Sequence, residues 1–510
     1  MQFVCDLSSF RSTPYRRKYL FDYFKRMSTD QLGALWDDNV ANCLLEQGYS
    51  IEEDPRSVYK VEKLYQALAK YAPKHAPRVN MHSELMHKGV ALARACFSKP
   101  EDVPYLPVPA FTPEFIQSIT SNYKASAGLT AWGQTKAQSY VRAYERGKQV
   151  MLGEKAPEPC LAFKRTQFND KTRLVWGYPY SMTAIEGLFA RPLIERFKGG
   201  LTPMAFGSTT GSLGSRLRVS SYHKTYAVST DVSSFDSSIP ADLIRAAFDI
   251  LSTWFDLSQI EPTTGVQLRS IWDKIVIYFV TTPIVMPDGN IYRGKRHGVP
   301  SGSYFTQIVD SVVNTMIVGV LDARYHLGVD RQDIFVLGDD LLFWTNQHVT
   351  LDALASFASR FFGMQFNAAK SAVFRFDEPI HFLGRDWVRG RPELPENEIL
   401  KRMAQPERYR RYSRDPAVRQ KEVGLLLLSY ACVYYNAYSI FQKAVHHQRF
   451  AWVPPAAYEK DAISLSGAFR RPVVEQDPDK LSGLNRYLLV YGGRSPRSGS
   501  YTPAALQFWK

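Results

Sequence analysis

Apolar and polar positions in the middle of the chain follow two different periods, which predicts a unit built from both strands and helices. The stretch "YAVSTD" at 226–231 reads as a short strand that ends in a carboxylate, and "IFVLGDDLLFWT" at 334–345 reads as a tight hairpin around Gly-Asp-Asp. "PADLIRAAFDILSTWF" starts at Pro240 with helical spacing, and "YFTQIVDSVVNTMIVGVLDARY" at 304–325 predicts a long buried helix. We therefore expect strands and helices to alternate over residues 226–385.

The N-terminal part of the chain, residues 1–125, is predicted to be mainly helical. "STDQLGALWDDNVANCLLEQG" has helical apolar spacing, a cap signal at Asp30 and a stop at Gly48. "SVYKVEKLYQALAKYAP" predicts a second helix that ends before Pro73. The proline-rich stretch at 100–113 predicts an extended connector.

Other stretches of the chain predict loops, hairpins and a basic helical end. "FGSTTGSLGS" at 206–215 reads as a loop, and "PIVMPDGNIY" at 283–292 reads as a hairpin. The chain after residue 386 is mostly helical in pattern, and residues 385–421 hold 11 Lys and Arg against 6 Asp and Glu. The most apolar stretch, at 423–440, is interrupted by polar residues, so it reads as a buried helix and not as a membrane span.

The charge of the chain narrows the class of partner. It has 63 Lys and Arg against 49 Asp and Glu, a formal net charge of +14. An excess of this size suggests a polyanion such as nucleic acid, with simple solubility as the alternative explanation. Five scattered cysteines without a C-x-x-C pair argue against a zinc ribbon or a disulfide scaffold, and no secretory signal is visible.

Two stretches rich in aspartate carry the candidate chemistry. "DVSSFD" places Asp231 at a strand end and Asp236 five residues further on, and the predicted hairpin places Asp339 and Asp340 at its tip. Either pair alone reads as ordinary solvated loop residues. Together, these carboxylates repel one another unless cations neutralise them, and hard oxygen ligands at this density suit Mg²⁺. Two such ions can activate an attacking hydroxyl and stabilise a leaving oxygen.

A serine–glycine loop before the long helix is a candidate ligand contact. "GVPSGSYFTQIVDSVVN" carries Ser301 and Gly302, and Thr306, Asp310 and Asn314 follow along the helix. A loop of this type can approach a ligand closely, and hydroxyl and carboxylate groups behind it can reach a ribose. The alternative is that Ser301 caps the helix and the other polar residues lie in the core.

Basic residues form a third candidate group. "FKRTQFNDKTR" carries Lys164, Arg165, Lys171 and Arg173 along a strand-like segment, which suits a triphosphate or a phosphate backbone. An exposed charged strand is the alternative. Lys370, in "FNAAKSAVF", is a candidate proton donor to departing pyrophosphate or merely a surface lysine.

In their order along the chain, these stretches resemble the motifs of a palm-domain RNA-dependent RNA polymerase of RNA viruses. "SAGLTAWGQTK" at 126–136 is similar to the motif at the template entrance, and "FKRTQFNDKTR" is similar to the basic fingers motif. The palm motifs follow as "DVSSFD", "PSGSYFTQIVDSVVN", "LGDD", "FNAAKS" and "HFLGRDW". The resemblance spans about residues 126–390, and "SAGL", "GVPSGSYFTQ" and "LGDD" look most like a partitivirus polymerase, with the picobirnaviruses as the near alternative.

The resemblance implies a role for each candidate residue. Asp231 and Asp339 would hold two catalytic Mg²⁺ ions, for which Mn²⁺ is a possible substitute, with Asp340 assisting. Asp236 would contact the incoming ribose together with Ser301 and Thr306, and Arg173 with its neighbours would bind the triphosphate.

The chain departs from the pattern at one position. Many positive-strand virus polymerases carry Asn where this chain has Asp310. An ionised carboxylate accepts hydrogen bonds but does not donate them, so this departure leaves the details of ribose discrimination open.

The implied fold is α+β, a closed right hand that is rich in helices and has a small antiparallel palm sheet. Residues 1–125 would form an N-terminal helical region and an extension of the fingers, and 126–225 the fingers. Residues 226–385 would form the palm, with a fingers insertion at about 240–298, and 386–510 the thumb and C-terminal region.

The resemblance also implies partners and a location. The partners are template and product RNA, nucleoside triphosphates and a viral capsid protein, and no membrane is involved. The polymerase would be a monomer that transcribes and replicates a segmented double-stranded RNA genome. It would act inside the virion, within the host cytoplasm. Two alternatives stay open: a non-catalytic RNA-binding protein associated with the capsid, which would explain the charge but not the aspartates, and a reverse transcriptase. The context of Gly338 and the set Ser301, Thr306 and Asp310 argue against reverse transcription.

Overall fold

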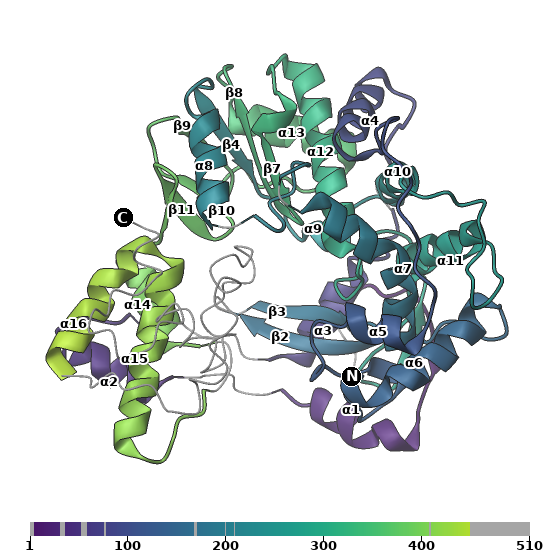
Figure 1. Ribbon diagram of the computed structural model, residues 1–510, viewed down its shortest axis with the longest axis horizontal. Coiled ribbons are helices and arrows are strands. Elements are labelled where there is room, and N and C mark those ends of the chain that lie inside the picture. Colours follow the sequence, from purple (N-terminus) through teal and green to yellow (C-terminus); the bar gives the residue numbers. More distant parts are fainter. Residues whose placement is uncertain are drawn as a thin grey trace.

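The computed structural model describes residues 5–30, 36–52, 59–75, 78–167, 171–198, 200–208, 210–406 and 410–448. Figure 1 shows the described elements in three groups. One group contains a four-stranded sheet with its helices, a second contains a five-stranded sheet with its helices, and a third contains the last helices of the chain together with one helix from near the N-terminus.

The first group is built on an antiparallel sheet of strand order β7-β8-β4-β9. Its strands are β7 (Ile334–Leu337), β8 (Asp340–Thr345), β4 (Tyr226–Thr230) and β9 (Ala372–Arg375). All of β7, and all of β8 after its first residue, is buried, which explains the two unbroken apolar runs in the sequence. Thr230 pairs with Leu341 in the register of β4 and β8, so the chain after β4 and the chain before Leu341 meet at one end of the sheet.

Helices pack against this sheet and against one another. Helix α12 (Thr306–Tyr325) lies against β7, and its residues from Ile308 to Leu321 are all buried. Helix α4 (Glu84–Phe97) crosses α12 at close range, because a Cβ added to Gly89 would lie 2.6 Å from the carbonyl oxygen of Met316. The other helices of this group are α8 (Thr210–Ser220), α9 (Phe235–Ser238), α10 (Ala241–Ser252) and α13 (Leu351–Phe362).

The second group is built on a five-stranded sheet of order β1-β6-β5-β2-β3. Its strands are β1 (Arg11–Pro14), β6 (Asn290–Arg293), β5 (Ile284–Val285), β2 (Cys160–Gln167) and β3 (Lys171–Gly177). Five helices lie around it: α1 (Phe21–Met27), α3 (Val61–Ala69), α5 (Pro113–Ile119), α6 (Lys136–Met151) and α7 (Tyr180–Phe197), with α11 (Leu268–Thr281) beyond α7. The predicted hairpin around Asp288-Gly289 is confirmed as β5 and β6.

The third group joins the two ends of the described chain. It holds α14 (Glu396–Ala404), α15 (Pro416–Val433) and α16 (Tyr438–Gln448), and Figure 1 shows α2 (Asp38–Leu45) beside them. Val40 and Leu44 of α2 share an apolar core with Ile399 and Leu426, and this core is separate from the main one. The N-terminal segment therefore reaches from the five-stranded sheet to the C-terminal helices and back.

The remaining elements are short. A three-stranded antiparallel sheet consists of β10 (Ile380–Phe382), β11 (Arg385–Val388) and β12 (Arg391–Glu393). Four 3₁₀ helices are η1 (Lys18–Leu20), η2 (Gly128–Thr130), η3 (Arg331–Asp333) and η4 (Tyr435–Ala437). Among the helices that the structure describes, none is long and apolar enough to cross a bilayer.

The loop prediction for "FGSTTGSLGS" was wrong in its second half. Helix α8 begins at Thr210 and continues through this Gly- and Ser-rich stretch. Leu213 and Leu217 are buried on one side of α8, and this packing outweighs the weak helix propensity of the neighbouring residues.

The predicted helix cap at Asp30 was assigned to the wrong helix. The carboxylate of Asp30 accepts a hydrogen bond from the backbone N–H of Val61 (2.8 Å), the first residue of α3. Helix α2 begins at Asp38 and has Asp37 as its cap, which accepts a hydrogen bond from the N–H of Val40 (3.3 Å). The predicted domain boundaries stay a prediction, and residues 449–510 of the predicted C-terminal region lie outside the described residues.

Candidate active site

The Gly338–Asp339 turn between β7 and β8 is held from behind by α12. Gly338 has φ +62°, a conformation that favours glycine. Its N–H donates to the hydroxyl of Ser311 (3.1 Å), and its carbonyl oxygen accepts from the amide Nδ2 of Asn314 (2.7 Å). Asn314, which was predicted to bind the nucleotide, thus uses its amide to fix this turn. Asp339 and Asp340, next in the chain, are both exposed.

Asp231 lies directly after β4, beside the start of β8. Its backbone N–H donates to the hydroxyl of Ser371 (3.0 Å), and its carbonyl oxygen accepts from the N–H of Asn367 (2.9 Å). The carboxylate oxygen Oδ1 is buried and makes no hydrogen bond. Because Thr230 pairs with Leu341, continuing the register places Asp231 opposite Asp340.

Asp236 and Asp310 form the more buried side of the site. Desolvation, followed by the charge of Asp339, raises the pKa of Asp236 to about 6, while Arg173 acts to lower it. Asp310 is 2% exposed and its Oδ1 has no hydrogen-bond partner. Burial, together with the charges of Asp236 and Asp339, raises the pKa of Asp310 well above its usual range, which favours the neutral acid.

Asp340 completes a set of mutually repelling carboxylates. Desolvation by the surrounding chain and the charges of Asp339 and Asp231 raise its pKa to about 7, and Arg173 opposes the rise. Solvent still reaches Asp340 and Asp339, so a ligand can reach them as well. The four aspartates of the two sequence stretches and Asp310 therefore lie in one electrostatic cluster that faces Arg173.

The basic stretch forms two strands instead of the single strand-like segment that was predicted. Arg165 of β2 pairs with Arg173 of β3, so both belong to the same side of the hairpin, and both are exposed. Lys164 alternates to the other face, where its ammonium lies 3.8 Å from the centre of the Tyr59 ring. Lys171 begins β3, and its side chain lies outside the described residues.

The serine–glycine loop, residues 300–305, packs against the end of β3. The hydroxyl of Ser301 accepts a hydrogen bond from the backbone N–H of Trp176 (3.3 Å), and Ser301 is not a cap of α12. A Cβ added to Gly302 would lie 2.1 Å from the carbonyl oxygen of Trp176, so only glycine fits there. The hydroxyl of Thr306 donates to the carbonyl oxygen of Pro300 (3.0 Å), which closes the loop.

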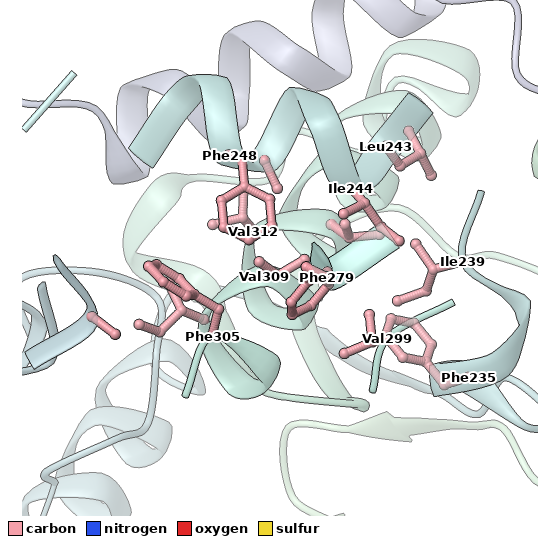
Figure 2. Close-up of a cluster of buried hydrophobic side chains, with 14 of the residues drawn as sticks. Phe235, Ile239, Leu243, Ile244, Phe248, Phe279, Val299, Phe305, Val309 and Val312 are labelled. Carbon is pink, nitrogen blue, oxygen red and sulfur yellow. The ribbon is translucent and has the colours of Figure 1, made fainter. Parts of the chain in front are cut away.

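An apolar cluster supports both sides of this site. Figure 2 shows Phe235, beside Asp236, and Val299 and Phe305, at the two ends of the loop, among the labelled side chains of the cluster. The site residues thus stand at the margin of a rigid packed core.

Lys370 is exposed and lies in the turn that precedes β9. Its backbone N–H donates to the carbonyl oxygen of Asn367 (3.2 Å), whose own N–H binds Asp231. The same turn thus carries Lys370 and anchors the backbone of Asp231, and the role of Lys370 as a proton donor stays a prediction.

The N-terminal region supplies residues that the sequence patterns did not point to. The ammonium of Lys70 donates to the hydroxyl of Ser234 (2.8 Å), a residue with φ +55° between Asp231 and Asp236. Tyr71 is buried beside Asp236 and donates to the carbonyl oxygen of Val299 (3.3 Å). A tyrosine at the end of an amphipathic helix is normally a core residue, so no sequence signal distinguishes a position beside the acidic site from ordinary packing.

The site has features that fit a divalent cation. Among the described residues, no group of three or more His, Cys, Asp or Glu side chains is arranged so that it could hold a metal ion by itself. Mg²⁺ in proteins that handle nucleotides is held by one or two carboxylates together with substrate phosphates and water, so a complete protein cage is not required. Such an ion would give the unpartnered Oδ1 of Asp231 a ligand and would reduce the repulsion among the neighbouring carboxylates.

Comparison with known proteins assigns the family. A family described as "Viral RNA-dependent RNA polymerase" matches residues 166–431, a little more than half of the chain. The chain belongs to this family, as its motifs predicted.

Curated relatives carry the same description. The RNA-directed RNA polymerase of Cryptosporidium parvum virus 1 is 34% identical over 164 residues, which cover 31% of this chain and 29% of the relative. That of White clover cryptic virus 1 is 25% identical over 318 residues, which cover 57% of this chain and 48% of the relative. The chain therefore spans less than half the length of either curated relative.

The fold is that of a right-hand viral polymerase. The crystal structure of the RNA-dependent RNA polymerase of a human picobirnavirus matches 99% of this chain and 99% of its own, with a TM-score of 0.68 and 16% sequence identity. A variant of that polymerase without its insertion loop matches 92% of this chain, with a TM-score of 0.63. The predicted α+β, helix-rich hand with a small antiparallel sheet is confirmed.

Proposed function

We propose that the chain is an RNA-directed RNA polymerase that transcribes and replicates the genome of a double-stranded RNA virus. The observation that carries the proposal is the meeting of Asp231, at the end of β4, with Asp339 and Asp340, at the β7–β8 turn. Arg173 faces this acidic set from β3, where a triphosphate would bring its negative charge.

In the proposed reaction, the 3′-hydroxyl of the RNA end loses its proton to water, and its oxygen bonds to the α-phosphorus of a nucleoside triphosphate. The bond from that phosphorus to the bridging oxygen breaks, and pyrophosphate leaves. Asp231 and Asp339, with Asp340 assisting, would hold two Mg²⁺ ions, for which Mn²⁺ is a possible substitute. When bound, these ions lower the pKa of the attacking hydroxyl and stabilise the charge on the leaving oxygen.

The other side chains would bind and orient the nucleotide. Arg173 and Arg165 would grip phosphate oxygens, and Lys370 would give a proton to pyrophosphate. Asp236 would contact the ribose together with the hydroxyls of Ser301 and Thr306. Gly302 would allow close approach of the backbone, because no side chain fits at that position.

The partners and location follow from the same proposal. Template and product RNA would bind through the excess of positive charge, so affinity should fall as salt rises. We also propose a viral capsid protein as a partner of a monomeric polymerase, and a site of action inside the virion within the host cytoplasm. The named viruses among the relatives support a double-stranded RNA virus of partitivirus or picobirnavirus type.

The test is incorporation of labelled nucleotide on an RNA template with Mg²⁺, using Asp339→Ala and the matched control Asp249→Ala. Asp249 is an exposed aspartate of α10, outside the acidic set. We expect Asp339→Ala to abolish incorporation and the control to keep it. A rate near that of the wild type in Asp339→Ala would refute the proposal, incorporation of dNTPs as fast as of rNTPs would indicate a reverse transcriptase, and RNA binding without turnover would indicate a non-catalytic protein.

A further inference from the structure

Helix α7 carries a fully buried glutamate that contacts the serine–glycine loop. Glu186 is 0% exposed, and its carboxylate oxygen Oε2 accepts hydrogen bonds from the hydroxyl of Ser303 (2.8 Å) and the backbone N–H of Tyr304 (2.8 Å). Its other oxygen, Oε1, accepts from the hydroxyl of Tyr178 (2.7 Å). Glu186 therefore joins the chain after β3 to the segment that leads into α12.

The loop is fixed on two sides by these contacts. On one side, the backbone of Trp176 binds the hydroxyl of Ser301 and leaves no room for a side chain at Gly302. On the other side, Glu186 holds the next two residues, and the hydroxyl of Ser303 also accepts from the N–H of Phe305 (3.1 Å). The ring of Phe305 then packs in the apolar cluster of Figure 2, which anchors the end of the loop.

A carboxylate suits this place for two physical reasons. The N–H groups before and in the first turn of a helix lack partners within the helix, and Glu186 accepts one of them at Tyr304. The N-terminal end of the 20-residue helix α12 also carries the positive end of the helix dipole, which favours a negative group. Glu186 lies too deep to touch a nucleotide, so it acts through the loop.

We infer that Glu186 is a positioning residue for the incoming nucleotide, because it holds the loop 300–305 in the place where Ser301 and Gly302 meet the sugar. This inference rests on the proposed polymerase function and on the proposed contact of Ser301 with the ribose. It assigns to α7 a part in the selection of ribonucleotides, although α7 contributes no residue to the acidic set.

The experiment measures kcat and KM for incorporation of one rNTP, and of the matching dNTP, by the full chain. In Glu186→Ala and in Ser303→Ala we expect the KM for the rNTP to rise about tenfold, as for one lost buried hydrogen bond, and the preference for rNTP over dNTP to fall. The double variant should be no worse than Glu186→Ala, since both changes break the same contact. Glu186→Gln should restore most of the KM, because its amide oxygen still accepts from Ser303 and Tyr304.

Glu261 provides the matched control. It is also 0% exposed and also binds loop N–H groups, those of Phe111 (2.8 Å), Thr263 (3.1 Å) and Thr264 (2.7 Å), none of them in the serine–glycine loop. Glu261→Ala should lower the yield or stability of the chain and leave KM and sugar preference unchanged. An equal rise of KM in Glu261→Ala would overturn the inference.

Two further outcomes separate this inference from the proposed function. If Ser301→Ala leaves KM and sugar preference unchanged, the ribose contact of Ser301 in the proposed function is wrong. If Ser301→Ala changes both but Glu186→Ala and Ser303→Ala do not, the inference about Glu186 is wrong. Should Glu186→Ala fail to fold, Ser303→Ala decides alone, and a KM equal to that of the wild type overturns the inference.

Discussion

Glu186 gives a stability prediction whose sign and size follow from the structure. Burial raises its pKa from 4.5 to about 7, against the hydrogen bonds from Tyr178, Ser303 and the backbone of Tyr304, which lower it. As pH rises from 4.5 to 7, the unfolded chain ionises this glutamate while the folded chain still holds its proton. The folded state of the wild type therefore loses stability over this window, and Glu186→Gln, which does not titrate, escapes the loss.

Between an unfolded pKa of 4.5 and a folded pKa of about 7, at about 1.4 kcal/mol per pKa unit, the full effect is about 3–4 kcal/mol. Most of it develops between pH 5 and 8, and it is constant above both pKa values. Between pH 5 and 8, Glu186→Gln should therefore gain about 2–3 kcal/mol of stability relative to the wild type, in addition to any difference that the amide causes at every pH.

The assay is unfolding by denaturant, with wild type and variant compared at pH 4, 5, 6, 7 and 8. Glu261→Gln is the control with the opposite sign. Burial tends to raise the pKa of Glu261, but hydrogen bonds from Phe111, Thr263 and Thr264 outweigh it and lower the pKa. The advantage of the wild type over Glu261→Gln should therefore stay flat above pH 5 and shrink below it. A difference between wild type and Glu186→Gln that does not change with pH would refute the reasoning.

Three other substitutions test the site and its support. Asp310→Asn should keep the rate of incorporation within about threefold of the wild type, because burial already favours the neutral acid, which Asn imitates. Asp310→Ala should lose more activity, and equal losses in a steady-state assay would contradict this. Gly302→Ala should raise the KM for nucleotide about tenfold, since its Cβ would overlap the Trp176 carbonyl oxygen. Gly328→Ala, which strains a residue with φ +63° but meets open space, should lower stability and leave KM unchanged. Gly89→Ala should lower the unfolding free energy by about 1–3 kcal/mol by forcing α4 away from α12, and a melting temperature equal to that of the wild type would disprove the close crossing.

Local patterns in the sequence were sufficient for the palm elements and for the acidic set. The strand at 226–230, the Gly-Asp-Asp hairpin and the helix at 306–325 all lie where apolar spacing placed them, because each is a strong pattern between clear turn residues. The family followed from the order of the motifs, and the match over residues 166–431 confirms it.

Contacts between distant segments were beyond the reach of these patterns. Asn314 holds the Gly338 carbonyl oxygen, Lys164 lies over Tyr59, and Tyr71 lies beside Asp236, yet each of these pairs is separated by many residues of chain. The prediction that Asp30 caps the next helix in the sequence failed for the same reason, since its carboxylate accepts a hydrogen bond from an N–H group 31 residues away. Glu186 was also missed, because a glutamate within an apolar helix carries no signal of the loop that it will contact.

In the proposed reaction, the carboxylate that follows β4 and those of the β7–β8 turn act on the same cations. The most direct test is binding of Mn²⁺ to the full chain in the presence of a nucleoside triphosphate, followed by electron paramagnetic resonance, for the wild type, Asp231→Asn and Asp339→Asn. We predict that either substitution weakens binding at the same site and that neither variant incorporates nucleotide. If one of the two bound Mn²⁺ as tightly as the wild type while the other did not, the two carboxylates would not share a cation, and the account would be wrong.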